Sequence, residues 1–408
     1  MAALGAALVA RAPALGQRNF RRYFFGQVCS VLGTFIQAVA MSWLVYRLTG
    51  SAALLGLAAF LSQAPQLLVS PLAGVVVDRF DRRRILIGLQ CLFALQALLL
   101  AGLVFFDLVQ VWHLLALSAL LGILNSFDLP SRQSLLLYLV DDRATLANAV
   151  AINAAVTHGG RFVGPPIAGL LLAALPESAC FLINALSYLG PILAVRAIRA
   201  DIPRQYALRT GRALVEVVDF IKQQASARAA LAAVALINAT ASSYVVLMPI
   251  FAKEIFAGDS RTLGWLLGMG GAGALTASLY LSTRPRAEQV AGALPPGCLL
   301  AGCGMLGFAA AGLVDAFWLA LPTVWMIGAG VGASNVAGNT RLQYLVPDRL
   351  RGRIVAIFAS SRFGFDALGG LLAGTLAAHF SVLPVVFGQG LLLVGGCLWL
   401  LPRLRQRD

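Results

Sequence analysis

The stretch Gly74-Val75-Val76-Val77-Asp78-Arg79-Phe80-Asp81-Arg82-Arg83-Arg84 decides the fold class of this chain. Six of its last seven residues are charged, and an apolar run long enough to cross a bilayer lies on either side. Because charges at this density cannot lie in hydrocarbon, we expect a tight turn at the membrane surface between two transmembrane helices. The arginines predict that this turn lies on the cytosolic side.

The composition independently indicates a membrane protein. Hydrophobic residues make up 59% of the 408 residues and charged residues 12%, whereas a soluble domain carries about 25% charged residues. Apolar runs of at least about 18 residues mark candidate spans. They predict an all-α membrane protein with twelve transmembrane helices, near residues 23–45, 51–77, 85–107, 109–128, 145–174, 178–196, 229–251, 262–283, 291–314, 316–338, 354–377 and 381–402.

The distribution of the 31 Lys and Arg residues predicts the orientation of these helices. With both termini in the cytosol, the outside loops hold only Arg47, Lys253 and Arg261. Arg161 and Arg362 fall within spans, and all the other basic residues lie in cytosolic segments. This bias is what the positive-inside rule requires of a chain with an even number of spans.

The net charge of +14 follows from this topology. The basic residues are spread over separate loops, so we expect no nucleic-acid partner. We do expect these residues to attract anionic membrane lipid. The six cysteines form no Cys-x-x-Cys pair and the three histidines are scattered, so no metal site is predicted. The sequence has no nucleotide-binding loop or hydrolase motif, so we expect neither a cofactor nor an enzyme.

The two parts of the chain repeat one sequence pattern. Tyr138-Leu-Val-Asp-Asp-Arg143 returns as Tyr344-Leu-Val-Pro-Asp-Arg349, and at the same offset Gly164 falls on Gly370. A parallel repeat predicts two pseudo-symmetric six-helix halves with the substrate between them. The predicted segments are a cytosolic N-terminal segment (1–22), an N-terminal bundle (23–196), a cytosolic linker with an amphipathic helix (197–228), a C-terminal bundle (229–402) and a cytosolic tail (403–408).

The pattern Gly-x-x-x-Asp-Arg-x-x-Arg-Arg from Gly74 to Arg83 resembles the loop between the second and third helices of the major facilitator superfamily of transporters. Further segments resemble the enterobactin-exporter and macrolide-efflux branch of that family: Trp43 to Ser51, Phe127 to Gln133, Arg161 to Gly169, Cys180 to Ala185 and Asn339 to Gln343. The resemblance implies the major facilitator fold, a monomer in the bacterial cytoplasmic (inner) membrane, and transport by alternating access.

The resemblance also implies a function. Gly164-Pro165-x-x-x-Gly169 looks like the fifth-helix motif of antiporters, and glycine and proline at these positions thin and bend a helix. The expected function is proton-coupled export of a small amphipathic compound, such as a siderophore, a macrolide or another drug. A lipid or lysophospholipid transporter of the same fold is the alternative, followed by a membrane sensor that transports nothing.

Charged residues within the spans are the candidates for proton coupling. Asp366 is the one acid well inside a span, and Arg362 precedes it by one turn, so the two can pair on one helix face. Burial favours the protonated form of a carboxylate, and access to Arg362 or Arg161 favours its charged form, which would make Asp366 bind and release a proton. A static Asp366–Arg362 pair is the competing interpretation, and Asp128 is the second candidate acid.

Two further groups of residues are predicted to face the transport pathway. The predicted cytosolic gate consists of Gly74, Asp78, Arg79, Arg82, Arg83, Arg132 and Arg353. By resemblance, the first, fourth, seventh and tenth spans line the cavity, with the polar residues Thr34, Gln37, Asn125, Asn238, Ser243, Tyr244, Asn335 and Asn339. Uncharged polar groups among apolar ones favour a mostly neutral, amphipathic ligand. About half of these residues are expected to form interhelical hydrogen bonds instead.

Overall fold

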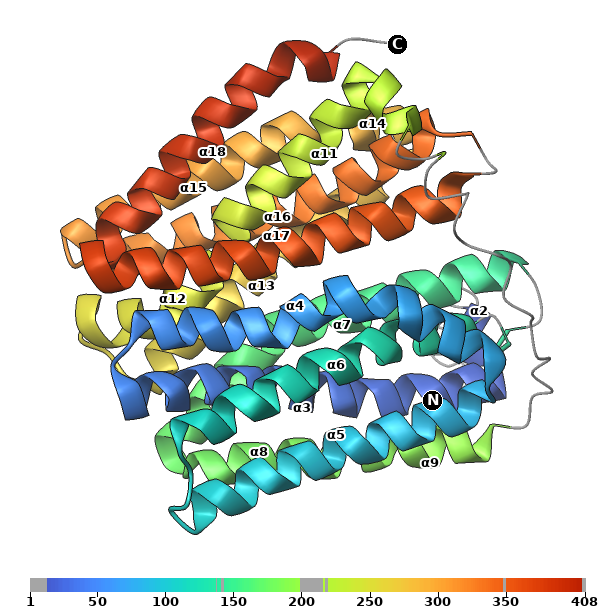
Figure 1. Cartoon of the computed structure of the whole chain (residues 1–408), viewed down its shortest axis with the longest axis horizontal. Helices are drawn as coiled ribbons and strands as arrows, with labels where there is room; N and C mark the ends of the chain where they lie inside the picture. The colour runs from blue at the N-terminus through green and yellow to red at the C-terminus, as the bar shows by residue number, and fades with distance from the viewer. Residues whose placement is uncertain are drawn as a thin grey trace, which may run out of the picture.

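Helices make up all the regular structure in the computed structural model, which describes residues 13–136, 138–140, 143–198, 216, 219–347 and 350–405. The N-bundle contains α2 (Pro13–Gly16), α3 (Arg18–Thr49), α4 (Ala52–Arg79), α5 (Arg82–Phe105), α6 (Val111–Leu136), α7 (Arg143–Ala174), α8 (Glu177–Ser187) and α9 (Leu189–Ala197). The C-bundle contains α11 (Ala225–Ile237), the π-helix η1 (Asn238–Ser242), α12 (Tyr244–Ile250), the π-helix η2 (Phe251–Ile255), α13 (Ser260–Ser282), α14 (Ala287–Ala291), α15 (Leu294–Leu313), α16 (Phe317–Leu345), α17 (Arg351–Phe380) and α18 (Val382–Arg405). Figure 1 shows the N-bundle below the C-bundle.

Ten helical segments of the described chain are long and apolar enough to cross a membrane. The other two predicted spans coincide with α7 and α13, which have 32 and 23 residues. These two helices carry prolines or many glycines, which lower their hydropathy, and they pack against each other and against further helices. The twelve-helix fold predicted from the sequence is confirmed.

The turn that decides the fold is held by Asp81. Its carboxylate accepts hydrogen bonds from the backbone N–H groups of Arg83 at 2.9 Å and Arg84 at 3.3 Å, so it caps the N-terminus of α5. A cap of this kind stabilises a helix by about 1 kcal/mol. This aspartate supplies the start signal of the next helix.

Several helices extend beyond the spans that hydropathy predicts. α3 begins at Arg18, although the predicted span begins at 23, and α6 continues to Leu136, although its predicted span ends at 128. The i,i+4 ion pair between Asp128 and Arg132 lies in that extension of α6. Hydropathy marks the part of a helix that fits in hydrocarbon, and charged residues continue the helix past that boundary.

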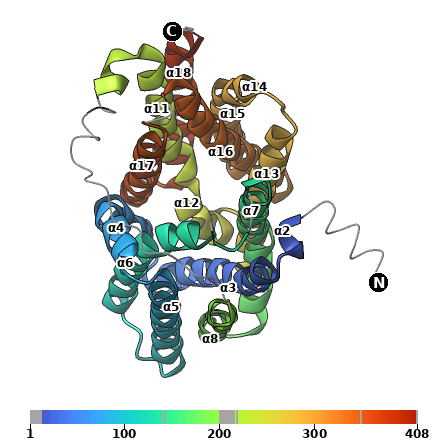
Figure 2. The same ribbon diagram turned by 90° about the vertical axis from the view of Figure 1, so that its right-hand side faces the viewer.

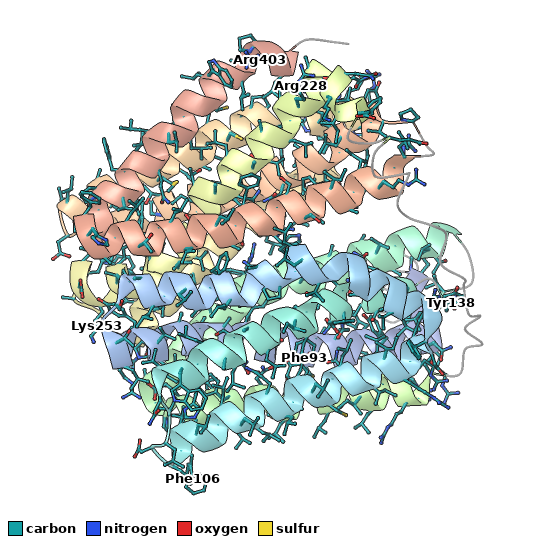
Figure 3. The ribbon with its side chains drawn as sticks, in the orientation of Figure 1. Phe93, Phe106, Tyr138, Arg228, Lys253 and Arg403 are labelled. Atoms are coloured by element: carbon teal, nitrogen blue, oxygen red, sulfur yellow. The ribbon has the colours of Figure 1, made fainter. Side chains whose placement is uncertain are left out.

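The helices run between two ends of the molecule. The arginine end carries the turn at Asp81, and the opposite end carries the turn at Gly50 between α3 and α4. Figure 3 places Lys253 and Phe106 at the opposite end and Tyr138 at the arginine end.

Two seams of small residues join the bundles toward the opposite end. On the α4–α17 seam, a side chain at Gly374 would come within 2.8 Å of the Cα atom of Gly56. On the α7–α13 seam, a side chain at Gly169 would come within 3.1 Å of the Cα atom of Gly264, and the Ser260 hydroxyl donates to the Gly169 carbonyl at 3.0 Å. Small residues let helix backbones approach this closely. Figure 2 shows the two seams on either side of the space between the bundles.

Several predicted features lie outside the described residues. They include residues 1–12 of the N-terminal segment, the last residues of the tail at 406–408, and two pairs within the repeated pattern, Asp141-Asp142 and Asp348-Arg349. Of the predicted linker, residues 199–215 and 217–218 are also outside, so its amphipathic helix stays a prediction.

Candidate functional site: a cavity between the bundles

A cavity of about 350 Å³ lies between the two bundles, roughly midway along the helices. α3, α4 and α7 of the N-bundle line one wall, and α12, α13 and α17 of the C-bundle line the other. Most of its lining is apolar, with polar side chains from both walls. A mostly apolar pocket with a few polar groups is the usual form of a small-molecule site.

At the opposite end the bundles are joined by hydrogen bonding as well as by the seams. The hydroxyl of Tyr46, which is buried, donates to the carboxylate of Glu254 in η2. The ammonium of Lys253 lies 5.7 Å from the centre of the Tyr46 ring. We call Tyr46, Lys253 and Glu254 the latch, because they connect α3 to η2 across the interface. These contacts therefore join the two bundles at the opposite end.

At the arginine end, the interactions between described residues do not join the bundles. Arg83 donates to the carbonyls of Val195 and Arg196, at 3.3 and 3.1 Å, within the N-bundle. Arg353 pairs with Glu216 of the linker at 3.8 Å. In Figure 1 the ribbons of α4 and α17, which meet near the opposite end, diverge toward the arginine end.

The predicted gate residues are distributed over both bundles. Gly74, Asp78 and Arg79 belong to the last turns of α4, and their side chains lie outside the described part of the structure. Arg82 is buried, and its guanidinium carbon lies 5.4 Å from the centre of the Tyr138 ring. A gate formed by these residues stays a prediction.

Asp128 lies away from the cavity, inside the N-bundle. Its carboxylate pairs with Arg132 at 2.5 Å and accepts a hydrogen bond from the Gln90 amide at 3.0 Å. Asp128 is buried, and neither it nor Arg132 belongs to the cavity lining. The four predicted proton-coupling residues therefore do not form one cluster.

Asp366 lies in the cavity wall and is bound from the other bundle. The side-chain amide of Gln63 on α4 donates a 2.5 Å hydrogen bond to its carboxylate. The described residues include no ion pair between Asp366 and Arg362, and the Arg362 guanidinium lies instead 5.2 Å from the centre of the Phe363 ring. The static Asp366–Arg362 pair predicted from their i,i+4 spacing is thus absent here. Asp366 instead binds Gln63 of α4, a partner that is distant in the sequence. A polar residue in the apolar second span was the available signal for Gln63.

Arg161 and Arg362 place two positive charges beside this carboxylate. Arg161 lines the cavity from α7, and the charges of Arg161 and Asp366 both act on Arg362. His158, one turn before Arg161, experiences the charges of both arginines. The sequence-based expectation of an uncharged lining considered only the first, fourth, seventh and tenth spans. The fixed charges come from the fifth and eleventh spans, α7 and α17.

The predicted cavity residues fall into two groups. Thr34, Gln37 and Tyr244 are in the lining. Gln37 also belongs to a buried amide network, because it donates to Gln96 at 3.0 Å and accepts from Asn184 at 2.7 Å. This network holds α3, α5 and α8 together, and Asn184 joins the lining although the sequence analysis did not select it.

The remaining predicted cavity residues are outside the lining. Asn238 donates to Asn335 at 3.1 Å, Gln343 donates to Asn339 at 3.0 Å, and Ser243 donates to the Thr240 carbonyl at 2.6 Å. Asn125 lies half-buried in α6. The Asn238–Asn335 bond joins two helices of the C-bundle, as does the bond that Gln389 of α18 donates to Ser243 at 3.2 Å. The Gln343–Asn339 bond lies within α16.

The predicted helix-bending motif lies on α7 next to the cavity. A side chain at Gly164 would come within 2.6 Å of the Phe35 Cβ atom, and Pro165 is part of the cavity lining. Gly169 belongs to the α7–α13 seam described above. The motif thus allows α7, the fifth transmembrane helix, to pack against helices of both bundles.

Known proteins resemble this chain over nearly its whole length. Residues 9–408 match the model of the transmembrane secretion effector family. A staphyloferrin A transporter of Staphylococcus aureus is 27% identical over 370 residues, which cover 88% of this chain and 90% of that protein. The multidrug efflux pump Tap of Mycolicibacterium fortuitum is 28% identical over 404 residues, which cover 94% and 96% of the two chains.

The fold also matches solved transporter structures. An inward-facing, occupied bacterial homologue of the human lysosomal transporter Spinster superposes with a TM-score of 0.74 at 13% identity, covering 96% of this chain and 98% of its own. At that identity the likeness concerns the fold alone. The family match, the two-bundle fold and the cavity between the bundles agree with the resemblance inferred from the Gly74–Arg83 motif, and they identify this chain as a transporter of the transmembrane secretion effector family within the major facilitator superfamily.

Proposed function

We propose that this protein exports a small amphipathic compound from the bacterial cytoplasm by proton-coupled alternating access. The observation that carries the proposal is the cavity whose two walls come from different bundles, with the Gln63–Asp366 hydrogen bond joining them. A site of this kind changes shape whenever the bundles rock against each other. The siderophore and multidrug transporters among the relatives support a small organic substrate.

The orientation rests on the positive-inside rule. The arginine-rich turns then face the cytosol, both termini are cytosolic, and the protein lies in the inner membrane. In this orientation the latch and the two seams close the cavity on the outside, and the substrate enters from the cytosol. Both walls of the cavity belong to one chain, which supports a monomer as the working unit.

Export requires the outside to open while the cytosolic side closes. The hydrogen bond of the latch and the small-residue seams are contacts that a rocking motion can break and reform. The seventh transmembrane span, Ala225–Ile255, contains the two π-helices η1 and η2 on either side of α12. Such segments often occur at functional sites, so these are the proposed points of bending.

Proton coupling is assigned to Asp366. In the present conformation its carboxylate accepts the Gln63 hydrogen bond and lies near Arg161 and Arg362. Opening toward the outside separates α4 from α17 and removes the Gln63 hydrogen bond, so the surroundings of the carboxylate differ between the two conformations. Uptake of a proton in the outside-open conformation and its release into the cytosol in the present one is the direction that antiport requires.

Everted membrane vesicles that are acidified inside by respiration test the proposal. Candidate amphiphiles, including a siderophore and a macrolide, are added while a fluorescent probe reports the pH gradient. A transported compound should release protons in wild-type vesicles and not in vesicles with Asp366→Asn. Proton release that persists in Asp366→Asn would remove Asp366 from the coupling step and make Asp128 the next candidate. An absence of release with every compound would contradict proton-coupled export.

A further inference from the structure

We infer that the cavity recognises an oxyanion, such as a carboxylate, on an otherwise apolar substrate, and that Arg161 binds this group with support from Arg362. The inference rests on the proposed transport function and specifies its substrate class. It replaces the expectation of a mostly neutral ligand, because that expectation did not include the charges on α7 and α17.

Positive charges outnumber negative ones at the cavity once Arg362 is counted. Arg161 and Asp366 are the two charged residues of the described lining and balance each other. Arg362 lies outside that lining, one turn from Asp366 on α17, and adds a second guanidinium close enough to interact electrostatically with both. Since arginine stays protonated in proteins, the surplus positive charge is permanent.

The single carboxylate is already engaged. Asp366 accepts the 2.5 Å hydrogen bond from Gln63. Within the described chain, neither Arg161 nor Arg362 forms a hydrogen bond or an ion pair with a side chain, and the Arg362 guanidinium lies over the Phe363 ring. An unpaired arginine at membrane depth is costly, and such residues usually mark a substrate or ion pathway.

The chemistry of the two arginines selects the ligand. A guanidinium binds carboxylates and phosphates through two parallel hydrogen bonds, so the group that fits is a planar or tetrahedral oxyanion. Around it the lining offers Phe35, Met41, Val45, Val245 and Leu267, which suit an apolar body. The substrate class is therefore an amphiphile with an anionic group.

The placement of the arginines also connects binding to the transport cycle. Arg161 belongs to the N-bundle and Arg362 to the C-bundle, and their like charges act on each other. An anion between them reduces this repulsion. A ligand shifts a conformational equilibrium only by binding one state better than another. An anion should bind more tightly when the two bundles bring Arg161 and Arg362 close to it, so its binding favours that conformation.

A matched pair of probes tests the inference on the purified full chain in lipid nanodiscs. The anionic probe is dansyl-11-aminoundecanoate, and the neutral probe is its methyl ester, which has the same apolar body. Binding is followed by dansyl fluorescence. A bidentate, charge-assisted pair in a mostly apolar cavity should favour the acid, so the wild type should bind the carboxylate about tenfold more tightly than the ester, which corresponds to about 1.4 kcal/mol.

Variants then locate the site. Arg161→Gln should remove most of that preference while retaining ester binding, and Arg161→Lys should restore it in part. Arg84→Gln, which changes an arginine that is 90% exposed at the turn of α5, is the matched control and should behave like wild type. Equal binding of acid and ester by the wild type, or an unchanged preference in Arg161→Gln, would overturn the inference.

Competition distinguishes the two sources of the oxyanion. Displacement of the probe by lysophosphatidate, but not by zwitterionic lysophosphatidylcholine, would support the anion site and identify lipid as its ligand. Displacement by medium-chain carboxylates alone would support the site and identify a soluble amphiphile. Because this is a binding measurement, a selective anion site without proton release in vesicles would contradict the proposed transport and leave the inference intact.

Discussion

The side chain of Gln63 on α4 donates a 2.5 Å hydrogen bond to the carboxylate of Asp366 on α17, across the interface of the two bundles. Asp366 is the one acid in the described lining of the cavity, and this hydrogen bond connects it to the N-bundle. Any motion that separates α4 from α17 breaks it. The proposed coupling of protons to conformation depends on this relationship.

Replacing one partner of this hydrogen bond should lower the free energy of unfolding more than replacing both partners. Gln63→Leu leaves a half-buried carboxylate without its hydrogen-bond donor, which lowers the stability by about 1–3 kcal/mol. Replacing both residues with apolar ones can leave the stability nearly unchanged. We expect Gln63→Leu to lower the Tm of the protein in detergent, and the double variant Gln63→Leu/Asp366→Leu to recover part of that loss. Strictly additive Tm changes would show that the two side chains do not interact.

The latch should control how often the outside opens. Tyr46→Phe removes the hydroxyl that donates to Glu254, and a hydrogen bond to a charged group contributes about 1.5–3 kcal/mol. The outside-open population should therefore rise roughly tenfold or more. Labelling of a cysteine introduced at Ala38, in the cavity lining, by an impermeant reagent from the outside measures this population.

The neighbouring pair Arg47–Glu177 provides the control for that prediction. It is an ion pair of 2.6 Å at the same end, but both residues belong to the N-bundle. Arg47→Gln should leave the labelling rate close to that of the wild type. An equal increase in both variants would indicate general loosening rather than release of the latch.

The α4–α17 seam should not tolerate a larger residue. A Cβ atom at Gly374 would lie 2.8 Å from the Gly56 Cα atom, so Gly374→Ala should push the helices apart and lower the Tm. Gly88 in α5 is the matched position, because a Cβ atom there meets nothing within 4 Å. Since alanine stabilises a helix interior by about 1 kcal/mol over glycine, Gly88→Ala should keep or raise the Tm. A higher Tm for Gly374→Ala would contradict the close packing.

Asp128 should matter for folding rather than for coupling. Asp128→Asn leaves the guanidinium of Arg132, whose side chain is 19% exposed, without its carboxylate, and breaking a largely buried pair in this way costs up to about 3–5 kcal/mol. We expect a low yield of folded protein, measured by size-exclusion chromatography, and a better yield for the double variant Asp128→Asn/Arg132→Gln. Normal yield with loss of proton release would instead assign Asp128 a role in coupling.

The helices could be predicted from the sequence because they depend on local properties. Length and hydropathy determine a span, the turn at Asp81 combines a capping residue with charges that hydrocarbon excludes, and both are visible in a short window of sequence. α7 and α13 show the limit of hydropathy: helices that pack against each other along a seam can include glycine, proline and charge.

The partners of the polar residues could not be predicted in the same way. Spacing favoured Arg362 for Asp366, because i,i+4 proximity is the contact that sequence reveals directly, whereas Gln63 approaches from a distant helix. Asn238 and Asn335 likewise looked like cavity residues and bind each other at 3.1 Å. Which face of a helix meets the cavity depends on how the helices pack around one another.

The most direct test of the account uses purified protein in proteoliposomes with an imposed pH gradient. Accumulation of a substrate identified in the vesicle assay is compared between the wild type and Asp366→Asn. The account predicts that the gradient drives accumulation by the wild type, whereas Asp366→Asn only equilibrates the substrate across the membrane. Gradient-driven accumulation by Asp366→Asn at the wild-type rate would contradict it.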